Sequence, residues 1–306
     1  MSLHQNAPAM TDRTLSLFEE HRRLLFGIAY RMLGAVTDAE DMVQDTYIRW
    51  QQVAPEEIRS SRAWLTTTIT RLCINHLQLA RVQRETYVGS WLPEPLVDER
   101  APDPAETSQL ADTLSLAFLV LLETLTPTER AVFILREGFG YEFSEIAAVV
   151  EKSEANCRQI LTRARQHLDE RRPRYDASQA DAEKLVAPFV MALRDGDLEA
   201  MLARLAKNVV LVADGGAKPG ALLRPLQGAE PVARAMLHAT RKHGIEQTDI
   251  RAATINGLPG FVRFQDGHAQ AVLAFGIAGG RIQAVFVISN PEKLRHLNRP
   301  TPDLTA

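Results

Sequence analysis

Apolar residues recur with the spacing of amphipathic helices through the N-terminal part of the chain. From Ser144 onward, this pattern predicts a short apolar helix, a polar turn at Glu151–Ser153 and a longer helix over Ala155–Asp169. The longer helix has one apolar stripe, made of Ile160, Leu161, Ala164 and Leu168. Its other faces are rich in arginine. The pair is therefore either an ordinary helical hairpin with a solvated face or a helix-turn-helix that binds the DNA major groove.

A second predicted helix, from Ser61 to about Leu79, also has an unusual polar face. Its apolar stripe consists of Trp64, Leu65, Ile69, Leu72 and Cys73. Four arginines and no acidic residue lie between Arg62 and Arg84, whereas a solvent-facing helix usually carries both signs of charge. We expect this face to contact bases as well as phosphates, because amides, hydroxyls and arginine can do both.

The segment before this helix is acidic. Thr37 and Glu40 have the spacing of a capping box, which predicts that a helix begins with Thr37 as its N-cap. The exposed side of that helix would carry Asp38, Asp41, Gln44 and Asp45. These residues either stabilise the helix through its dipole or face a protein partner. The second interpretation is favoured, because an acidic surface beside a DNA-reading helix is unsuited to DNA.

After about residue 175 the pattern changes to helices followed by alternating strands. Helices are predicted at 181–194, 197–206 and 228–243. Strands are predicted at 209–213, 250–255, 261–264, 269–277 and 282–288. Gly279 and Gly280 predict a tight hairpin turn between the last two strands. This order indicates an α+β domain with a curled antiparallel sheet.

Between the two helical parts, residues 89–112 form a linker with four prolines and an excess of acidic residues. The linker is either a solvated spacer or a mimic of nucleic acid that lies in a basic channel of a partner. Trp91 beside two prolines also suggests a docking partner for the linker. We expect the C-terminal domain to pack against it or against the first helical domain.

Composition and charge narrow the function further. The net charge of the chain is −3, divided between −5 for residues 1–175 and +2 for the remainder, so any affinity for DNA must come from local patches. The two cysteines, Cys73 and Cys157, suit a reducing cytoplasm and are expected to be core residues, with redox sensing as the alternative. We find no signal peptide and no apolar run long enough to span a membrane.

Catalysis by the C-terminal domain is not expected. The part after Tyr175 contains no further tyrosine that could serve as an oxyanion donor, and no tryptophan. Its histidines lack metal-ligand spacing: His238, His243, His268 and His296. We therefore predict no enzyme activity, no cofactor and no metal.

Several ordered motifs resemble a known family. Leu24–Gly34, Asp38–Tyr47 and Ala63–Leu65 are similar to region two of bacterial sigma factors. Leu125–Arg130, Ile146–Ala147 and Arg163–Arg165 are similar to region four. No counterpart of region three lies between them, as in the extracytoplasmic-function sigma factors. One departure is the turn of the helix-turn-helix, which usually carries a glycine and here reads Val150-Glu151-Lys152-Ser153.

Three further motifs resemble the sigma factors that carry a fused SnoaL-like domain, the sigma-J type. They are Trp91–Pro95, Asp214–Lys218 and Asn290–Leu294. The second motif usually has another glycine where this chain has Ala217. The resemblance implies two all-α DNA-binding domains, the second a helix-turn-helix, followed by a cone-shaped α+β domain of the SnoaL or ketosteroid-isomerase type. The expected boundaries are 12–88 for region two, 89–112 for the linker, 113–174 for region four and 178–297 for the fused domain.

The resemblance also implies a function. The chain would bind core RNA polymerase, through the clamp of its largest subunit, and direct it to promoters, with region two melting the −10 element and region four reading the −35 element. The fused domain would regulate this activity and could bind a small ligand or partner protein. The alternatives are a ligand-responsive DNA-binding regulator that does not bind polymerase, and an enzyme with an appended DNA-binding module. The acidic helix and the two separate DNA-reading domains argue against the regulator.

The candidate site residues form three groups. Expected DNA contacts are Arg62, Thr67, Thr70, Arg71, Asn75, Gln78, Arg81, Arg84, Ser153, Asn156, Arg158, Gln159, Thr162 and Arg163. Expected polymerase contacts are Asp38, Asp41, Gln44, Asp45 and Arg49. Expected regulatory residues are Trp91, Pro93, Glu94, Asp214, Lys218, Asn290 and Lys293. Asp214 could pair with Lys218, with Asn290 and Lys293, or with the linker, or its turn could be a solvated loop.

Overall fold

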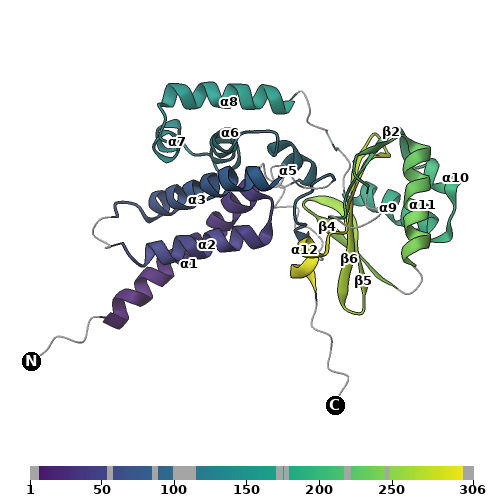
Figure 1. Cartoon of the computed structure of the whole chain (residues 1–306), viewed down its shortest axis with the longest axis horizontal. Helices are drawn as coiled ribbons and strands as arrows, with labels where there is room; N and C mark the ends of the chain where they lie inside the picture. The colour runs from purple at the N-terminus through teal and green to yellow at the C-terminus, as the bar shows by residue number, and fades with distance from the viewer. Residues whose placement is uncertain are drawn as a thin grey trace, which may run out of the picture. The chain divides into compact units, whose positions relative to one another are not determined.

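The computed structural model describes residues 7–53, 58–84, 89–98, 115–169, 175, 179–216, 222–244 and 248–298. The chain divides into two compact units (Figure 1). The first unit comprises Met1–Glu85 and Leu121–Arg171, and the second comprises Thr86–Val120 and Arg172–Ala306. Both predicted DNA-reading helices therefore lie in the first unit, and the linker belongs to the same unit as the C-terminal domain. No described helix is both long and apolar enough to cross a membrane.

The first unit begins with three helices, α1 (Ala7–Leu33), α2 (Val36–Trp50) and α3 (Ser61–Arg84). The N-cap of α2 is Ala35, with no side-chain cap, so the predicted capping box at Thr37 is wrong. Gly34, with φ 69°, ends α1, and α2 starts at once, which places Thr37 inside its first turn. Trp50 at the end of α2 donates from Nε1 to the carbonyl oxygen of Thr14 in α1 at 3.0 Å.

The first unit continues with α6 (Pro127–Phe133), the π-helix η3 (Ile134–Gly138), α7 (Phe143–Val150) and α8 (Glu154–Asp169). The sequence predicts the start of α6 correctly, because Thr126 and Glu129 form both hydrogen bonds of a capping box before Pro127. Helices α7 and α8 are the expected helix-turn-helix. Figure 1 shows them next to one another above α3.

A buried arginine joins the beginning and the end of this unit. Arg130 of α6 is 3% exposed and donates to the carbonyl oxygen of Met32 in α1 at 2.6 Å and to Glu123 at 2.7 Å. Arg31 is also buried and lies over the ring of Phe139, with 5.0 Å between its Cζ and the ring centroid. Burial lowers the pKa of Arg31 to about 10. Helix α1 and the segment after α6 therefore share one packed interior.

The second unit is built on a seven-stranded sheet with the order β1-β4-β5-β6-β7-β2-β3. The strands are β1 (Val97–Asp98), β2 (Leu205–Asp214), β3 (Leu226–Gln227), β4 (Asp249–Ile255), β5 (Leu258–Gln265), β6 (His268–Ala278) and β7 (Arg281–Ile288). The sheet is mixed, because β2 pairs with β7 in parallel, so the expected purely antiparallel sheet is wrong. Alternation of apolar residues predicts strands but carries no information on which distant strand becomes a partner.

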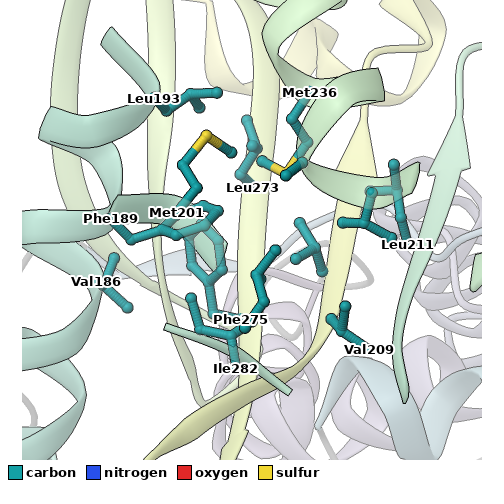
Figure 2. Packing of buried hydrophobic residues seen from close by; sticks show 14 of the residues in the cluster. Val186, Phe189, Leu193, Met201, Val209, Leu211, Met236, Leu273, Phe275 and Ile282 are labelled. Atoms are coloured by element: carbon teal, nitrogen blue, oxygen red, sulfur yellow. The ribbon is translucent and has the colours of Figure 1, made fainter. Parts of the chain in front are cut away.

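Each face of this sheet is covered by a hydrophobic layer. One face packs against α9 (Gln179–Asp195), α10 (Leu198–Leu202) and α11 (Ala229–His243). Figure 2 shows this core, in which Phe189 and Met201 approach Phe275 of β6, and the ring centroids of Phe189 and Phe275 are 5.6 Å apart. The helices and strands therefore form the expected α+β domain, around an interior filled by apolar side chains.

The other face of the sheet is covered by residues of the linker and α5 (Leu116–Leu122), which lie outside the predicted bounds 178–297 of the fused domain, and by α12 (Pro291–Leu294), which lies inside them. Leu92 of the linker and Leu116 of α5 are fully buried in this second core, together with Leu294 of α12. Tyr175 packs against the same core. A Cβ atom on Gly276 would lie 2.3 Å from the ring of Tyr175, so this close contact requires glycine in β6.

Candidate nucleic-acid interface and linker site

Helix α8 has the two faces that the sequence predicts. Cys157, Ile160, Leu161, Ala164 and Leu168 are buried. The opposite side exposes Ser153, Arg158, Gln159, Thr162 and Arg163, with Asn156 half-buried. These are the six candidate DNA contacts of this helix, and they form one continuous polar surface.

Local interactions orient the start of α8. The Oγ of Ser153 accepts a hydrogen bond from the backbone N–H of Asn156 at 3.2 Å, which caps the helix. Arg158 binds Glu154 at 2.8 Å, and its Cζ lies 4.9 Å from the ring centroid of Phe143 in α7. The two helices of the motif are therefore linked by an aromatic–guanidinium contact.

The turn before α8 has an uncommon backbone. Glu151, the C-cap of α7, is left-handed with φ 55° and ψ 48°. Glycine or asparagine usually occupies such a position, because a Cβ atom crowds the backbone there. The geometry of a helix-turn-helix is thus formed without the usual glycine.

Helix α3 confirms the predicted apolar stripe but not all of its polar face. Leu65, Ile69, Leu72 and Cys73 are buried, and Trp64 is half-buried against Trp50. Arg62, Arg71, Asn75 and Gln78 are exposed, and Thr67 is half-buried. The expectation that Thr70 contacts DNA does not fit, because its side chain is 0% exposed. The side chains of Arg81 and Arg84 lie outside the described residues.

Two exposed residues of α3 have partners that the sequence did not predict. Arg62 donates from Nε to the hydroxyl oxygen of Tyr141 at 3.2 Å, and Thr66 shares a 2.7 Å hydrogen bond with the same hydroxyl. Arg71 binds backbone carbonyl oxygens of α7. Periodicity identifies the polar face of a helix but not what lies against it.

Helix α2 exposes the acidic surface that was expected. Asp41, Gln44, Asp45 and Arg49 are exposed, whereas Ala39, Val43, Thr46 and Trp50 are buried. Asp38 is half-buried, with its Oδ2 3.6 Å from Nε2 of His76. Four of the five candidate polymerase contacts are thus accessible on one side of α2.

In the second unit, a buried ion pair holds the linker. Oδ2 of Asp214 lies 2.7 Å from Nζ of Lys293, and the side chain of Asp214 is 0% exposed. The backbone N–H of Leu92 donates to Asp214 at 2.9 Å, and Lys293 donates to the carbonyl oxygen of Leu92. The Nζ of Lys293 also lies 4.4 Å from the ring centroid of Trp91. Of the alternatives for Asp214, pairing with Lys293 and the linker is therefore the one observed.

The neighbouring linker residues extend this contact along the sheet. His296 donates to the carbonyl oxygen of Pro95 at 2.9 Å. Leu96 donates to Oδ1 of Asn256 at 3.0 Å and accepts from its backbone N–H at 2.9 Å. Strand β1 then pairs with β4. His296 and Asn256 were missed as linker contacts, although Asn256–Gly257 is a recognisable turn signal.

Of the remaining predicted regulatory residues, those that the structure describes lie in or beside the same site. Asn290 caps α12 through its side chain and donates its backbone N–H to the carbonyl oxygen of Asp214 at 3.1 Å. Pro93 and Glu94 are buried. Lys218 lies outside the described residues. We refer to Asp214, Lys293 and the Trp91–Asp98 segment that they hold as the linker clasp.

The two cysteines belong to the hydrophobic interior. Both cysteines are fully buried, and burial raises the pKa of their thiols. They are core residues, as expected. Among the described residues, no three His, Cys, Asp or Glu side chains gather in a way that could hold a metal ion.

Comparison with known proteins identifies the first unit. Residues 17–82 match Sigma-70 region 2, and residues 115–168 match Sigma-70 region 4. Over 296 residues the chain is 34% identical to the ECF RNA polymerase sigma factor SigJ of Mycobacterium tuberculosis, covering 91% of this chain and 92% of SigJ. The chain belongs to the extracytoplasmic-function sigma factors. As a sigma factor it directs RNA polymerase to promoters and is not an enzyme.

The solved structure of one relative agrees with this assignment. The crystal structure of SigJ from Mycobacterium tuberculosis aligns with a TM-score of 0.72 and 31% identity, covering 94% of this chain and 99% of SigJ. The similarity therefore includes the fused C-terminal domain. A SnoaL-like protein of unknown function from Burkholderia thailandensis aligns with a TM-score of 0.28 and 17% identity. The alignment covers 37% of this chain and 97% of that protein's chain.

Proposed function

We propose that this sigma factor contacts promoter DNA with α3 and α8 and core polymerase with the acidic face of α2. We further propose that its fused domain restrains it by holding the linker. The contact with polymerase would be made by Asp41, Gln44, Asp45 and Arg49, against the clamp of the largest subunit. The observation that carries the regulatory part is the linker clasp, which builds the linker into the sheet of the fused domain.

The exposed faces support the two binding assignments. On α8, Arg158, Gln159 and Arg163 point to solvent, and such side chains can bind base edges in the major groove. On α2, the exposed acidic residues suit a basic protein surface, and opposite charges increase both association rate and specificity. The two surfaces carry opposite charges and lie on different helices, which suits two different partners.

The length of the linker explains how the clasp could restrain the protein. Promoter elements centred near −35 and −10 are about 25 base pairs apart, which is about 85 Å along B-DNA. A free chain of about 30 residues between region two and region four could extend to about 100 Å. In the clasped form, Leu92 and Leu116 are buried in the same core, so the two ends of the linker are held within one small domain.

The chemistry of the clasp favours a switch between two states. The domain can regulate only if it has different affinities for the free and the held linker. Its main contacts are to the backbone of Leu92 and Leu96, so they are lost together when the linker leaves. Asp214 and Lys293 would remain paired and accessible to a competing partner or ligand.

Run-off transcription with purified core polymerase tests this proposal in the full-length chain. Lys293→Met removes the ammonium at similar volume, and Trp91→Ala weakens the clasp from the linker side with less effect on the domain. Both variants should give more transcript than the wild type. Arg295→Gln is the matched control, because Arg295 lies two residues from Lys293 and is 76% exposed.

The outcomes separate the parts of the proposal. If the wild type gives no promoter-specific transcript with any core polymerase tested, the assignment of the DNA and polymerase surfaces fails. If the wild type is active but neither clasp variant increases the transcript while both remain folded by circular dichroism, restraint by the fused domain is wrong.

A further inference from the structure

Within the first unit, region four covers an arginine of the helix with which region two would contact DNA. Arg71 of α3 donates from Nε to the carbonyl oxygen of Val149 at 3.0 Å and from Nη2 to that of Ala148 at 2.8 Å. Its Nη2 is also 3.1 Å from Oε1 of Glu151 in the turn of the helix-turn-helix. Three acceptors of region four therefore surround one guanidinium of region two.

The position of these acceptors explains why a guanidinium fits there. The last four carbonyl groups of a helix have no partner within it, and they carry the negative end of the helix dipole. Helix α7 ends at Val150, so Ala148 and Val149 supply two of these groups. Arg71 acts as a C-terminal cap for α7, although it belongs to a different region of the sigma factor.

Glu151 occupies a backbone position that does not favour glutamate. Its left-handed conformation is one in which glycine is the usual residue, because glycine has no Cβ atom. A glutamate therefore needs a reason other than turn geometry. The structure offers one, because its carboxylate reaches Arg71 from the turn.

A second contact lies nearer the start of α3. The hydroxyls of Thr66 and Tyr141 are 2.7 Å apart in the interior, and the Cζ atom of Arg62 lies 5.1 Å from the ring centroid of Tyr141. Both arginines of α3 whose side chains are described are thus engaged by region four. The DNA-facing surface of region two is partly covered in this arrangement.

The size of the unit excludes simultaneous binding to both promoter elements. A compact domain of about 130 residues has a radius of gyration of about 14 Å. A unit of this size is far too small to span the distance between the −35 and −10 elements, which is about 85 Å. Region four must leave α3 before a promoter can be bound at both elements.

We propose that Arg71 and Glu151 form a latch that keeps region four closed over the DNA-contacting helix of region two. The latch opens when the sigma factor binds polymerase and promoter. This inference rests on the proposed function in one respect, since it takes α3 and α8 as the DNA-contacting helices. The latch is partly exposed, with 44% of the Arg71 side chain and 75% of the Glu151 side chain accessible, so it is weak enough to open reversibly.

Distance measurements in the full-length chain test the latch directly. Spin labels on Arg23→Cys in α1 and Gln166→Cys in α8 would report the separation of the two regions by double electron–electron resonance. Both positions are exposed, whereas the native cysteines are fully buried and should not react. Glu151→Gln removes the charge and should shift the distribution toward longer distances. Glu142→Gln is the matched control, because Glu142 pairs with Arg136 of region four.

Run-off transcription with core polymerase then tests whether the latch is inhibitory. Glu151→Gln should raise the initial rate about two- to fivefold, the range expected for loss of an exposed ion pair, and Glu142→Gln should not. Raising the salt concentration should lengthen the distances in the wild type and have less effect in Glu151→Gln.

Each result decides one point. Unchanged distances in Glu151→Gln would overturn the latch, and longer distances without a faster rate would overturn its inhibitory role. If the wild type itself does not transcribe, the proposed function fails, whereas the distance measurement still shows whether the latch exists.

Discussion

Asp214 and Lys293 bind the same linker residue from two sides while they bind each other. Asp214 accepts the N–H of Leu92, and Lys293 donates to the carbonyl oxygen of Leu92. The two side chains are 2.7 Å apart and lie 79 positions apart in the sequence. Because both contacts are to the backbone of Leu92, they do not depend on its side chain, whereas the neighbouring Trp91 contacts Lys293 through its ring.

Removing one member of this pair should be much more costly than replacing both. Lys293→Met leaves the carboxylate of Asp214 buried without its partner and should lower the free energy of unfolding by about 3–5 kcal/mol. The double variant Asp214→Leu with Lys293→Met should lose clearly less than the sum of the single variants. Urea unfolding monitored by circular dichroism measures both values. Additive losses would mean that the two side chains do not interact.

The contact between Gly276 and Tyr175 predicts a second coupled pair. A Cβ atom at Gly276 would lie 2.3 Å from the tyrosine ring, so Gly276→Ala should displace the ring and cost about 1–3 kcal/mol. In a Tyr175→Ala background the same substitution should cost much less. Urea unfolding of the four proteins gives the coupling energy. Equal costs in both backgrounds would contradict the contact.

Tyr175 also predicts a loss of stability at alkaline pH. Burial raises the pKa of its phenol from 10 to about 12. The unfolded chain therefore releases this proton at lower pH than the folded chain does. The contribution of Tyr175 to stability is present below about pH 10 and is lost as the pH rises toward about 12. Tyr175→Phe should show a smaller loss of urea stability over that range, and an identical loss would contradict the burial of the phenol.

The exposed arginines of α8 predict that promoter binding depends on their side chains. Arg163→Ala should weaken promoter binding about ten- to a hundredfold if the side chain binds guanine in two places. Competition binding of the polymerase holoenzyme to intact and scrambled −35 elements measures the change. Arg165→Ala is a suitable control, because Arg165 binds Glu137 of its own region at 2.6 Å. An equal loss on scrambled DNA would make Arg163 a phosphate contact.

The acidic face of α2 predicts the interface with polymerase. Reversing Asp41 and Asp45 to lysine should abolish co-elution with core polymerase, because like charges would then oppose each other. Both residues are exposed, so the thermal stability of the chain should change little. Replacing the exposed Glu230 and Glu199 of the fused domain by lysine gives the same change in charge elsewhere. Loss of binding in that control would point to a general charge effect.

Much of the fold follows from local signals in the sequence. Thr126, Pro127 and Glu129 predict the start of α6 because every contact of a capping box lies within four residues. Gly279 and Gly280 predict a hairpin for the same reason, and both have positive φ angles in the structure. The prediction of Thr37 as an N-cap is wrong although its local signal is equally good, because Thr37 lies inside a helix that already starts at Val36.

The remaining features depend on partners that are distant in sequence. The parallel pairing of β2 with β7 joins residues about 75 positions apart, and alternation does not specify it. Thr70 is buried and Arg71 is bound because α3 packs against other helices of the first unit. The local helical pattern does not specify these neighbours, so it predicts an exposed polar face. In the clasp, the family motifs brought Asp214 and Lys293 to attention, but the backbone groups that they bind carry no sequence signature.

The linker supplies the edge strand β1 of the sheet, and this has a consequence for the independence of the fused domain. A fragment that began at residue 176 would lack β1, Leu92 and Leu116. The end of β4 at Ile255 and the following Asn256 would then present unpaired backbone groups, beside an uncovered apolar face. Sheet edges of this kind recruit strands from other molecules. The isolated domain should therefore form dimers or aggregates that pair through the open edge of β4, and its smallest self-contained form is one that includes the linker.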